Sequence, residues 1–69
     1  METVKIKTEY ITLGQLLKFL SIASSGGDIK AILATTTITV DGEVDNRRGR
    51  KIYPGMIVDL DTFGVYKVL

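Results

Sequence analysis

The spacing of apolar residues changes along the chain. Val4 and Ile6 alternate with lysines, which predicts a short strand with one exposed face. A stripe at i, i+3, i+4 and i+7 then predicts an amphipathic helix. Its apolar members are Leu13, Leu16, Leu17 and Leu20. The opposite, polar side of this helix is expected to carry Gln15 and Lys18.

Both expected helices begin at capping signals. Thr12 and Gln15 have the spacing of a capping box, and Ser25 and Asp28 repeat it before a second short helix. The β-branched run 35–37 ends that second helix. Its buried face is expected to carry Ile29, Ile32 and Leu33.

From residue 38 onward the apolar period is two. Asp41-Gly42 is a strong hairpin signal between two short strands, and Pro54-Gly55 suits the centre of a type II turn. Further strands are expected at 56–60 and 65–69. The predicted order is β-α-α-β-β-β-β. This is an α+β fold with two short helices packed on a small antiparallel sheet.

The amino-acid composition excludes several classes of function. The 69 residues carry a formal net charge of +1 and contain neither Cys nor His, which excludes thiolate and imidazole chemistry and zinc-finger sites. We expect one domain over residues 1–69. The longest apolar stretch, Ala31–Ala34, is far too short for a membrane span, and the N-terminus lacks signal-peptide features. A cytoplasmic protein is expected, with no membrane partner.

The sharpest chemical feature is a basic run. Four of the nine cations fall within residues 47–51, around Gly49. They are Arg47, Arg48, Arg50 and Lys51. Guanidinium groups suit phosphate because the planar fork donates two parallel hydrogen bonds. The same run also fits a solvated loop whose charges keep the protein soluble and discourage another chain from pairing with an edge strand.

Two other features bear on that choice. The residues Ser25, Gly26 and Gly27 offer a hydroxyl and uncrowded backbone N–H groups at a helix start, which suits an anion or merely a capped helix. Lys18 and Lys30 lie off the apolar stripes, where they either border one exposed surface or are simply solvated.

The chain has few aromatic side chains that could stack on nucleobases. Tyr53 is expected to cover the edge of the core rather than stack on a base, and Phe19 is expected to lie in the core.

Nothing indicates catalysis. The carboxylates fall mostly in turns and on exposed strand positions, with no pair held on adjacent helical turns. Gly26-Gly27 lacks the Lys-Ser/Thr ending of a nucleotide-hydrolase phosphate loop. We therefore expect no catalytic residue, no metal site and no cofactor.

An ordered set of segments resembles a known family. The segments are Leu16–Leu20, Ala23–Ser25, Lys30, Ile32–Leu33, Ile38–Val44 and Pro54–Gly55. They resemble the RNA-binding domain of the ribosomal protein S-four type, the alpha-L motif, and most of all its small stand-alone bacterial members. The resemblance covers about residues 11–60 and leaves 61–69 as a C-terminal strand extension.

The resemblance implies one RNA-binding face formed by the first helix, the start of the second helix and the hairpin turn. Carried over, it points to Gln15, Lys18, Ser25, Gly26, Gly27, Lys30, Asp41 and Gly42. The wider family often has Arg at position 26, Gly at 36 and Asn at 41, where this chain has Gly, Thr and Asp. The lost arginine and the added carboxylate weaken phosphate contact, and the basic run 47–51 is placed to compensate.

Two hypotheses follow. The first is a non-enzymatic protein that docks on structured RNA, expected from the resemblance to be ribosomal RNA or a ribosomal particle. The second is a protein-interaction module that uses the basic loop and an edge strand at the C-terminus. The oligomeric state stays open.

Overall fold

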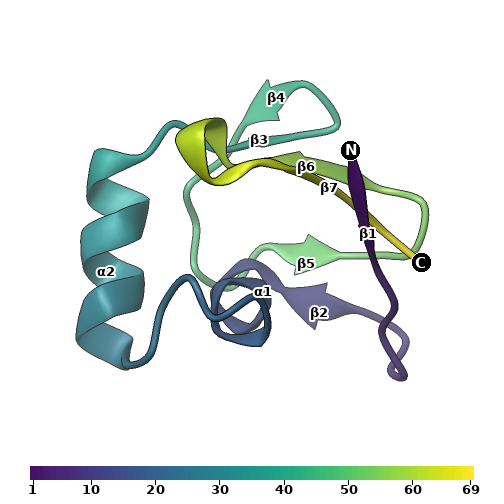
Figure 1. Cartoon of the computed structure of the whole chain (residues 1–69), viewed down its shortest axis with the longest axis horizontal. Coiled ribbons are helices and arrows are strands. Elements are labelled where there is room, and N and C mark those ends of the chain that lie inside the picture. The colour runs from purple at the N-terminus through teal and green to yellow at the C-terminus, as the bar shows by residue number, and fades with distance from the viewer.

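Two short helices and two β-sheets form the fold in a computed structural model that describes residues 1–69 (Figure 1). The elements are β1 (Glu2–Val4), β2 (Ile11–Thr12), α1 (Leu13–Phe19), α2 (Gly26–Thr35), β3 (Thr39–Val40), β4 (Glu43–Val44), β5 (Lys51–Ile52), β6 (Ile57–Asp59), the 3-10 helix η1 (Asp61–Phe63) and β7 (Val65–Val68). The α+β class with two helices on a small sheet is confirmed.

The larger sheet has the strand order β1-β7-β6-β3-β4. The pairs from β3 to β7 are antiparallel, as predicted, whereas β1 runs parallel to β7 and makes the sheet mixed. Because β7 is hydrogen-bonded on both sides, it is not an edge strand. The prediction of an available C-terminal edge is therefore wrong, and the edges of this sheet are β1 and β4.

A second, two-stranded sheet was not expected from the sequence. Its strands β2 and β5 pair Ile11 with Ile52 and Thr12 with Lys51. Strands of two residues carry no measurable period, so the sequence pattern assigned Lys51 to a polar loop. The first strand also begins earlier than expected, at Glu2, because its pairing with β7 decides its limits. The pair β2–β5 places the basic run directly beside the start of α1.

One apolar core lies between the sheet and the helices. Its fully buried members include Leu13, Leu16, Leu17, Ile29, Ile38, Val40, Ile52, Val58, Leu60 and Val68. The predicted buried faces of both helices are confirmed, with Ile32 and Leu33 partly buried. Phe19 is the exception. Its side chain is 59% exposed, because the neighbouring leucines already fill the core-facing side of α1.

The predicted turns and one of the two predicted capping boxes are present. Asp41 and Gly42 both have positive φ angles, 50° and 86°, which define a type I′ hairpin. Gly55 has φ 99°, and Met56 N–H donates to the Tyr53 carbonyl at 3.1 Å, as a type II turn requires.

Thr12 and Gln15 close a full capping box at α1. At α2, Ser25 Oγ accepts from Asp28 N at 3.2 Å, but the Asp28 carboxylate turns to Ser24 instead of the cap. The expected second box is therefore only half formed.

Candidate nucleic-acid interface

The backbone of the basic run caps α1. The first N–H groups of a helix have no acceptor within the helix. Here Leu13 N donates to the Arg50 carbonyl at 2.8 Å, and Gly14 N donates to the Arg48 carbonyl at 3.0 Å. These bonds, together with the β2–β5 pair, hold residues 48–51 against the start of α1. The basic run is thus fixed to the fold rather than a freely moving loop.

Arg48 lies between the starts of the two helices. A Cβ built on Gly14 would approach Arg48 Cγ to 2.8 Å, and a Cβ on Gly26 would lie 3.7 Å from both Nη1 and Nη2 of Arg48. Arg48 takes part in neither of the two ion pairs in the chain. Gly14 therefore leaves room for the Arg48 side chain, and its unpaired guanidinium lies within ordinary contact distance of Gly26.

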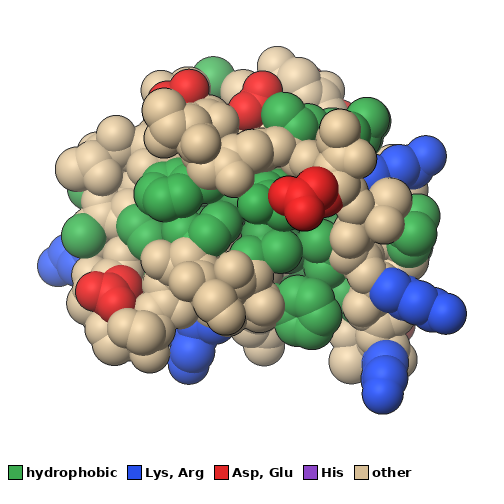
Figure 2. Space-filling view, in the orientation of Figure 1, with side chains coloured by type: hydrophobic (Ala, Val, Ile, Leu, Met, Phe, Trp, Pro, Cys, Tyr) green, Lys and Arg blue, Asp and Glu red, His purple; other side chains and the backbone are tan.

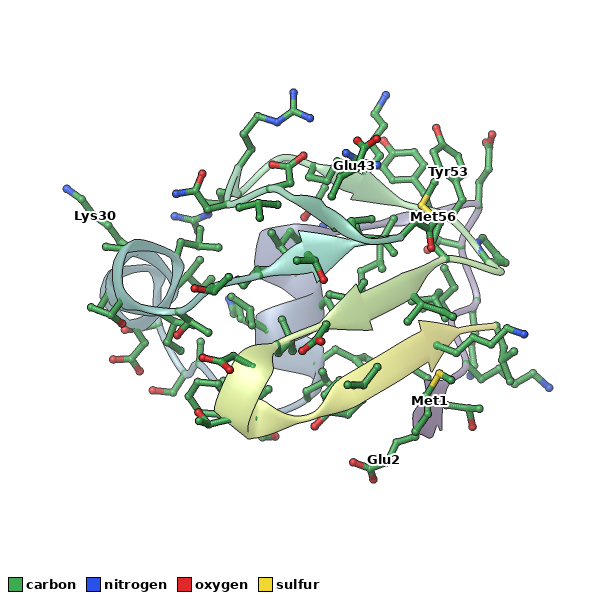
Figure 3. All side chains as sticks on the ribbon, turned by 90° about the horizontal axis from the view of Figure 1, so that it is seen from above. Met1, Glu2, Lys30, Glu43, Tyr53 and Met56 are labelled. Carbon is green, nitrogen blue, oxygen red and sulfur yellow. The ribbon has the colours of Figure 1, made fainter.

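A surface hollow surrounds this guanidinium. It is lined by Gly26, Lys30, Leu33, Ala34, Asn46 and Arg48. Figure 3 shows Lys30 projecting outward from α2. The N–H groups of Gly26 and Gly27 form no hydrogen bond within the chain. We call this hollow, with the two glycine N–H groups, the Arg48 site. It combines two cationic side chains with backbone donors at a helix N-terminus, which suits an anion.

The start of α2 also carries a negative charge. Asp28 accepts hydrogen bonds from both the hydroxyl and the backbone N–H of Ser24, and these bonds lower the pKa of its carboxyl. Asp28 therefore stays ionised in the first turn of α2, where it offsets part of the helix dipole. The Arg48 and Lys30 side chains must supply the larger share of any anion attraction there.

Asp45 forms ion pairs with two of the four cations of the basic run. Its carboxylate accepts from Arg47 Nη2 at 2.8 Å and from Arg50 Nη1 at 2.9 Å. It also accepts from Arg47 Nε and from the Arg47 backbone N–H. The hydrogen bonds from Arg47, with a smaller contribution from Arg50, hold the pKa of Asp45 well below its usual range, and the same contact raises the pKa of Arg47. Two of the four cations are therefore partly neutralised by one buried carboxylate.

A second hollow lies along the other side of the basic run. Its lining residues are Arg47, Gly49, Arg50, Lys51, Tyr53 and Met56. The Tyr53 side chain packs on Tyr10 with ring centroids 5.6 Å apart. Figure 3 shows Tyr53 and Met56 close together, on the side of the molecule away from Met1 and Glu2. We call this the Tyr53 hollow.

Other residues predicted for the site lie elsewhere. Gln15 and Lys18 line a third hollow with Thr8, Ile11 and Phe19. The Gln15 amide oxygen accepts from Thr12 N at 3.0 Å and so serves the helix cap. Lys18 and Lys30 line different hollows. The face in Figure 2 shows Lys and Arg at its margin around an apolar centre, so no single basic patch covers that face.

The hairpin turn takes no part in any hollow. Asp41 Oδ1 accepts from Ile57 N at 2.8 Å, which ties the turn to β6. Gly42 has nothing near its open side. In this chain the Asp41 carboxylate thus has a structural hydrogen bond.

Sequence reasoning missed several residues around the basic run. Gly14 and Asn46 contribute to the surroundings of Arg48, Tyr10 supports Tyr53, and Asp45 pairs two arginines. Only Asp45 left a signal in the sequence, as an acid two positions before the basic run. The other contacts join segments far apart in the chain.

No three acidic side chains gather where they could hold a metal ion. None of the helices has the length and apolar character needed to cross a bilayer.

This fold, with a cationic hollow at the start of α2, defines a small RNA-binding domain of the alpha-L type. The model of the S4 domain family matches residues 4–69, so the chain belongs to that family. The match extends beyond residues 11–60 at both ends. The chain is also 46% identical over 66 residues to the probable ribosome maturation protein RlbA of Bacillus subtilis (strain 168), covering 96% of this chain and 93% of the relative. No solved structure matches the chain.

Proposed function

We propose that this chain acts as one non-enzymatic domain that docks on structured RNA through the Arg48 site and the neighbouring basic run. The RNA is ribosomal or belongs to a ribosomal particle, and the binding takes place in the cytoplasm. The relative named as a probable ribosome maturation protein supports the ribosomal assignment, because the two chains align over nearly their full lengths.

One observation carries the proposal. The wider family often has an arginine at position 26, and this chain has glycine there. The Arg48 guanidinium comes from the basic run and lies 3.7 Å from the position that a Cβ on Gly26 would take. A cation from another segment thus stands beside the helix start, within ordinary contact distance of position 26. This supports phosphate binding at the start of α2.

The chemistry of the site suits recognition of a folded RNA by its shape and backbone more than recognition of a particular base sequence. RNA helices are recognised mainly by shape and by contacts to phosphates and 2′-hydroxyls, since their deep major groove admits no side chains. Guanidinium, ammonium and backbone N–H groups are all donors to phosphate oxygens. The Arg48 site holds these donors on rigid elements, two helix starts and a capped loop.

The experiment is a binding titration of the protein with a ribosomal RNA hairpin at low salt. Arg48→Ala removes the unpaired guanidinium, and Lys67→Ala removes an equal charge from an exposed position on β7. We expect Arg48→Ala to weaken binding strongly and Lys67→Ala to change it by less than about twofold, because screening limits distant charges. Equal losses in the two variants would show only a general charge effect and would contradict the proposed site.

A further inference from the structure

The Tyr53 hollow is not needed for phosphate binding at the Arg48 site, yet it combines two kinds of group that a nucleotide requires. Lys51, which forms no ion pair, lines it with positive charge, and Tyr53 and Met56 line it with an aromatic ring and a thioether. Cations bind a phosphate, while an aromatic face binds the plane of a base. A merely solvated loop needs only the charges.

The Tyr53 ring is held in place before any ligand arrives. The type II turn brings Met56 back to Tyr53, with the Met56 N–H on the Tyr53 carbonyl and the Tyr53 N–H 3.4 Å from Met56 Sδ. Tyr10 packs against Tyr53 at an interplanar angle of 47°, and the Lys51 ammonium lies 5.1 Å from the centre of the Tyr10 ring. An ordered ring loses little freedom on binding, which favours affinity.

Tyr53 nevertheless keeps 36% of its surface in solvent. Tyr66, by comparison, is 8% exposed and belongs to the core. Tyr53 covers part of Tyr10 and is not one of the fourteen core residues. An exposed, supported aromatic ring beside cations is the arrangement on which single-stranded bases stack.

We propose that the Tyr53 hollow is a stacking subsite for one unpaired nucleobase of the bound RNA. The inference rests on the proposed function, because the Arg48 site holds the paired part of the same RNA. Tyr53 lies five positions after Arg48, so their Cα atoms are at most about 18 Å apart. One RNA with a bulged nucleotide beside a helix can therefore contact both.

The test uses two RNA hairpins with the same stem. One stem is fully paired, and the other contains a single unpaired 2-aminopurine, whose fluorescence reports stacking. We expect the bulged RNA to bind at least about fivefold more tightly, as one stacked base gives, and its fluorescence to change on binding. Tyr53→Leu should abolish both differences, whereas Tyr53→Phe should preserve them because the ring remains.

A matched control separates stacking from loss of an exposed aromatic group. Phe63 is 43% exposed in η1, which follows β6, whereas the Tyr53 turn precedes β6. Phe63→Leu should leave the preference for the bulged RNA unchanged. A thermal melt of each variant shows whether it folds. If Tyr53→Leu does not fold, the 2-aminopurine signal of the unsubstituted chain decides the matter.

The outcomes separate this subsite from the proposed function. Equal binding of the two hairpins, an unchanged 2-aminopurine signal, or an equal loss for both RNAs in Tyr53→Leu overturns the subsite. In each of these cases, binding of the paired hairpin that depends on Arg48 leaves the proposed function standing. If neither hairpin binds, the proposed function fails first, and the subsite fails with it.

Discussion

Arg48 and Arg47 are neighbours in the chain and have the same side chain, but their surroundings differ. Arg47 donates three hydrogen bonds from its side chain to the buried carboxylate of Asp45, and its own side chain is 72% exposed. Arg48 has no carboxylate partner and lies beside Gly14 and Gly26. Arg50 shares Asp45 with Arg47. The fold therefore assigns the arginines of one basic run to two different tasks.

This difference shows that the number of cations in a basic run overstates the charge available to a ligand. Asp45 and its two arginines shape the loop, and the loop carbonyls cap α1. Arg48 is left to face the start of α2. Its lack of a partner means that a bound phosphate would not have to displace a carboxylate from it. The arginine without a carboxylate partner in the free protein is thus the one most suited to bind RNA.

Removing Arg48 should have the largest effect on RNA binding. A hydrogen bond to a charged group contributes about 1.5–3 kcal/mol. Arg48→Ala is therefore expected to lower affinity for a structured RNA by roughly 10-fold to 100-fold, measured by fluorescence anisotropy. Arg47→Ala should lower it by less than about threefold, because that guanidinium is engaged by Asp45. If Arg47→Ala has the larger effect, the assignment of the two arginines is reversed.

Removing the carboxylate should affect folding stability rather than binding. Asp45→Asn weakens the charged hydrogen bonds that hold Arg47 and Arg50. At neutral pH we expect the Tm to fall by about 2–4 °C, because the Arg47 side chain is 72% exposed and an ion pair with an exposed partner contributes little. Thermal melts followed by circular dichroism measure the change. RNA affinity should not decrease, since the substitution removes a negative charge.

The stabilisation by the Asp45 carboxylate should decrease as the pH is lowered. The native pKa of Asp45 lies below its unfolded value, so its stabilisation is complete above the unfolded pKa near 4. Stabilisation is then lost as the pH falls toward the lowered native pKa. The Tm difference between the unsubstituted chain and Asp45→Asn should therefore narrow below about pH 4. A difference that stays constant from neutral to acid pH argues against the ion-pair account.

The smallest expected effects come from the two glycines beside Arg48. In Gly14→Ala the new Cβ would lie 2.8 Å from Arg48 Cγ, so the flexible arginine must move. We expect RNA affinity to drop by about threefold, a fraction of the loss in Arg48→Ala. The Tm should not fall sharply, because alanine favours a helix over glycine.

Gly26→Ala is the matched control. Its Cβ meets the Arg48 guanidinium at 3.7 Å, an ordinary contact. Affinity should change by less than about twofold, as measured by the same anisotropy titration. Equal losses in the two glycine variants would mean that the position of the Arg48 side chain does not govern binding.

Most of the fold could be predicted from local signals. The leucine stripe, the Thr12 cap and the Asp41-Gly42 and Pro54-Gly55 turns each depend on residues close together in the chain, and the structure contains all of them. The strands β2 and β5 could not be predicted, because pairing between segments forty residues apart defines them. The parallel β1–β7 pair joins the two ends of the chain and was missed for the same reason.

The candidate site was predicted only as a set of residue types. Charge and glycine content pointed to residues 47–51 and to the start of α2, and the structure brings Arg48 to Gly26. The sequence did not show that Asp45 engages two of the arginines, nor that Gln15 and Asp41 use their side-chain oxygens in structural hydrogen bonds. Hydrogen-bond partners depend on side-chain directions that only the folded chain defines.

The salt dependence of RNA binding by the unsubstituted chain and by Arg48→Ala tests the central claim most directly. Each phosphate contact releases counterions, so the slope of log affinity against log salt reports the number of contacts. We predict a slope of about −2 to −4 for the unsubstituted chain and a slope shallower by about 1 in Arg48→Ala. A slope near zero, or the same slope in both proteins, would contradict phosphate binding by Arg48.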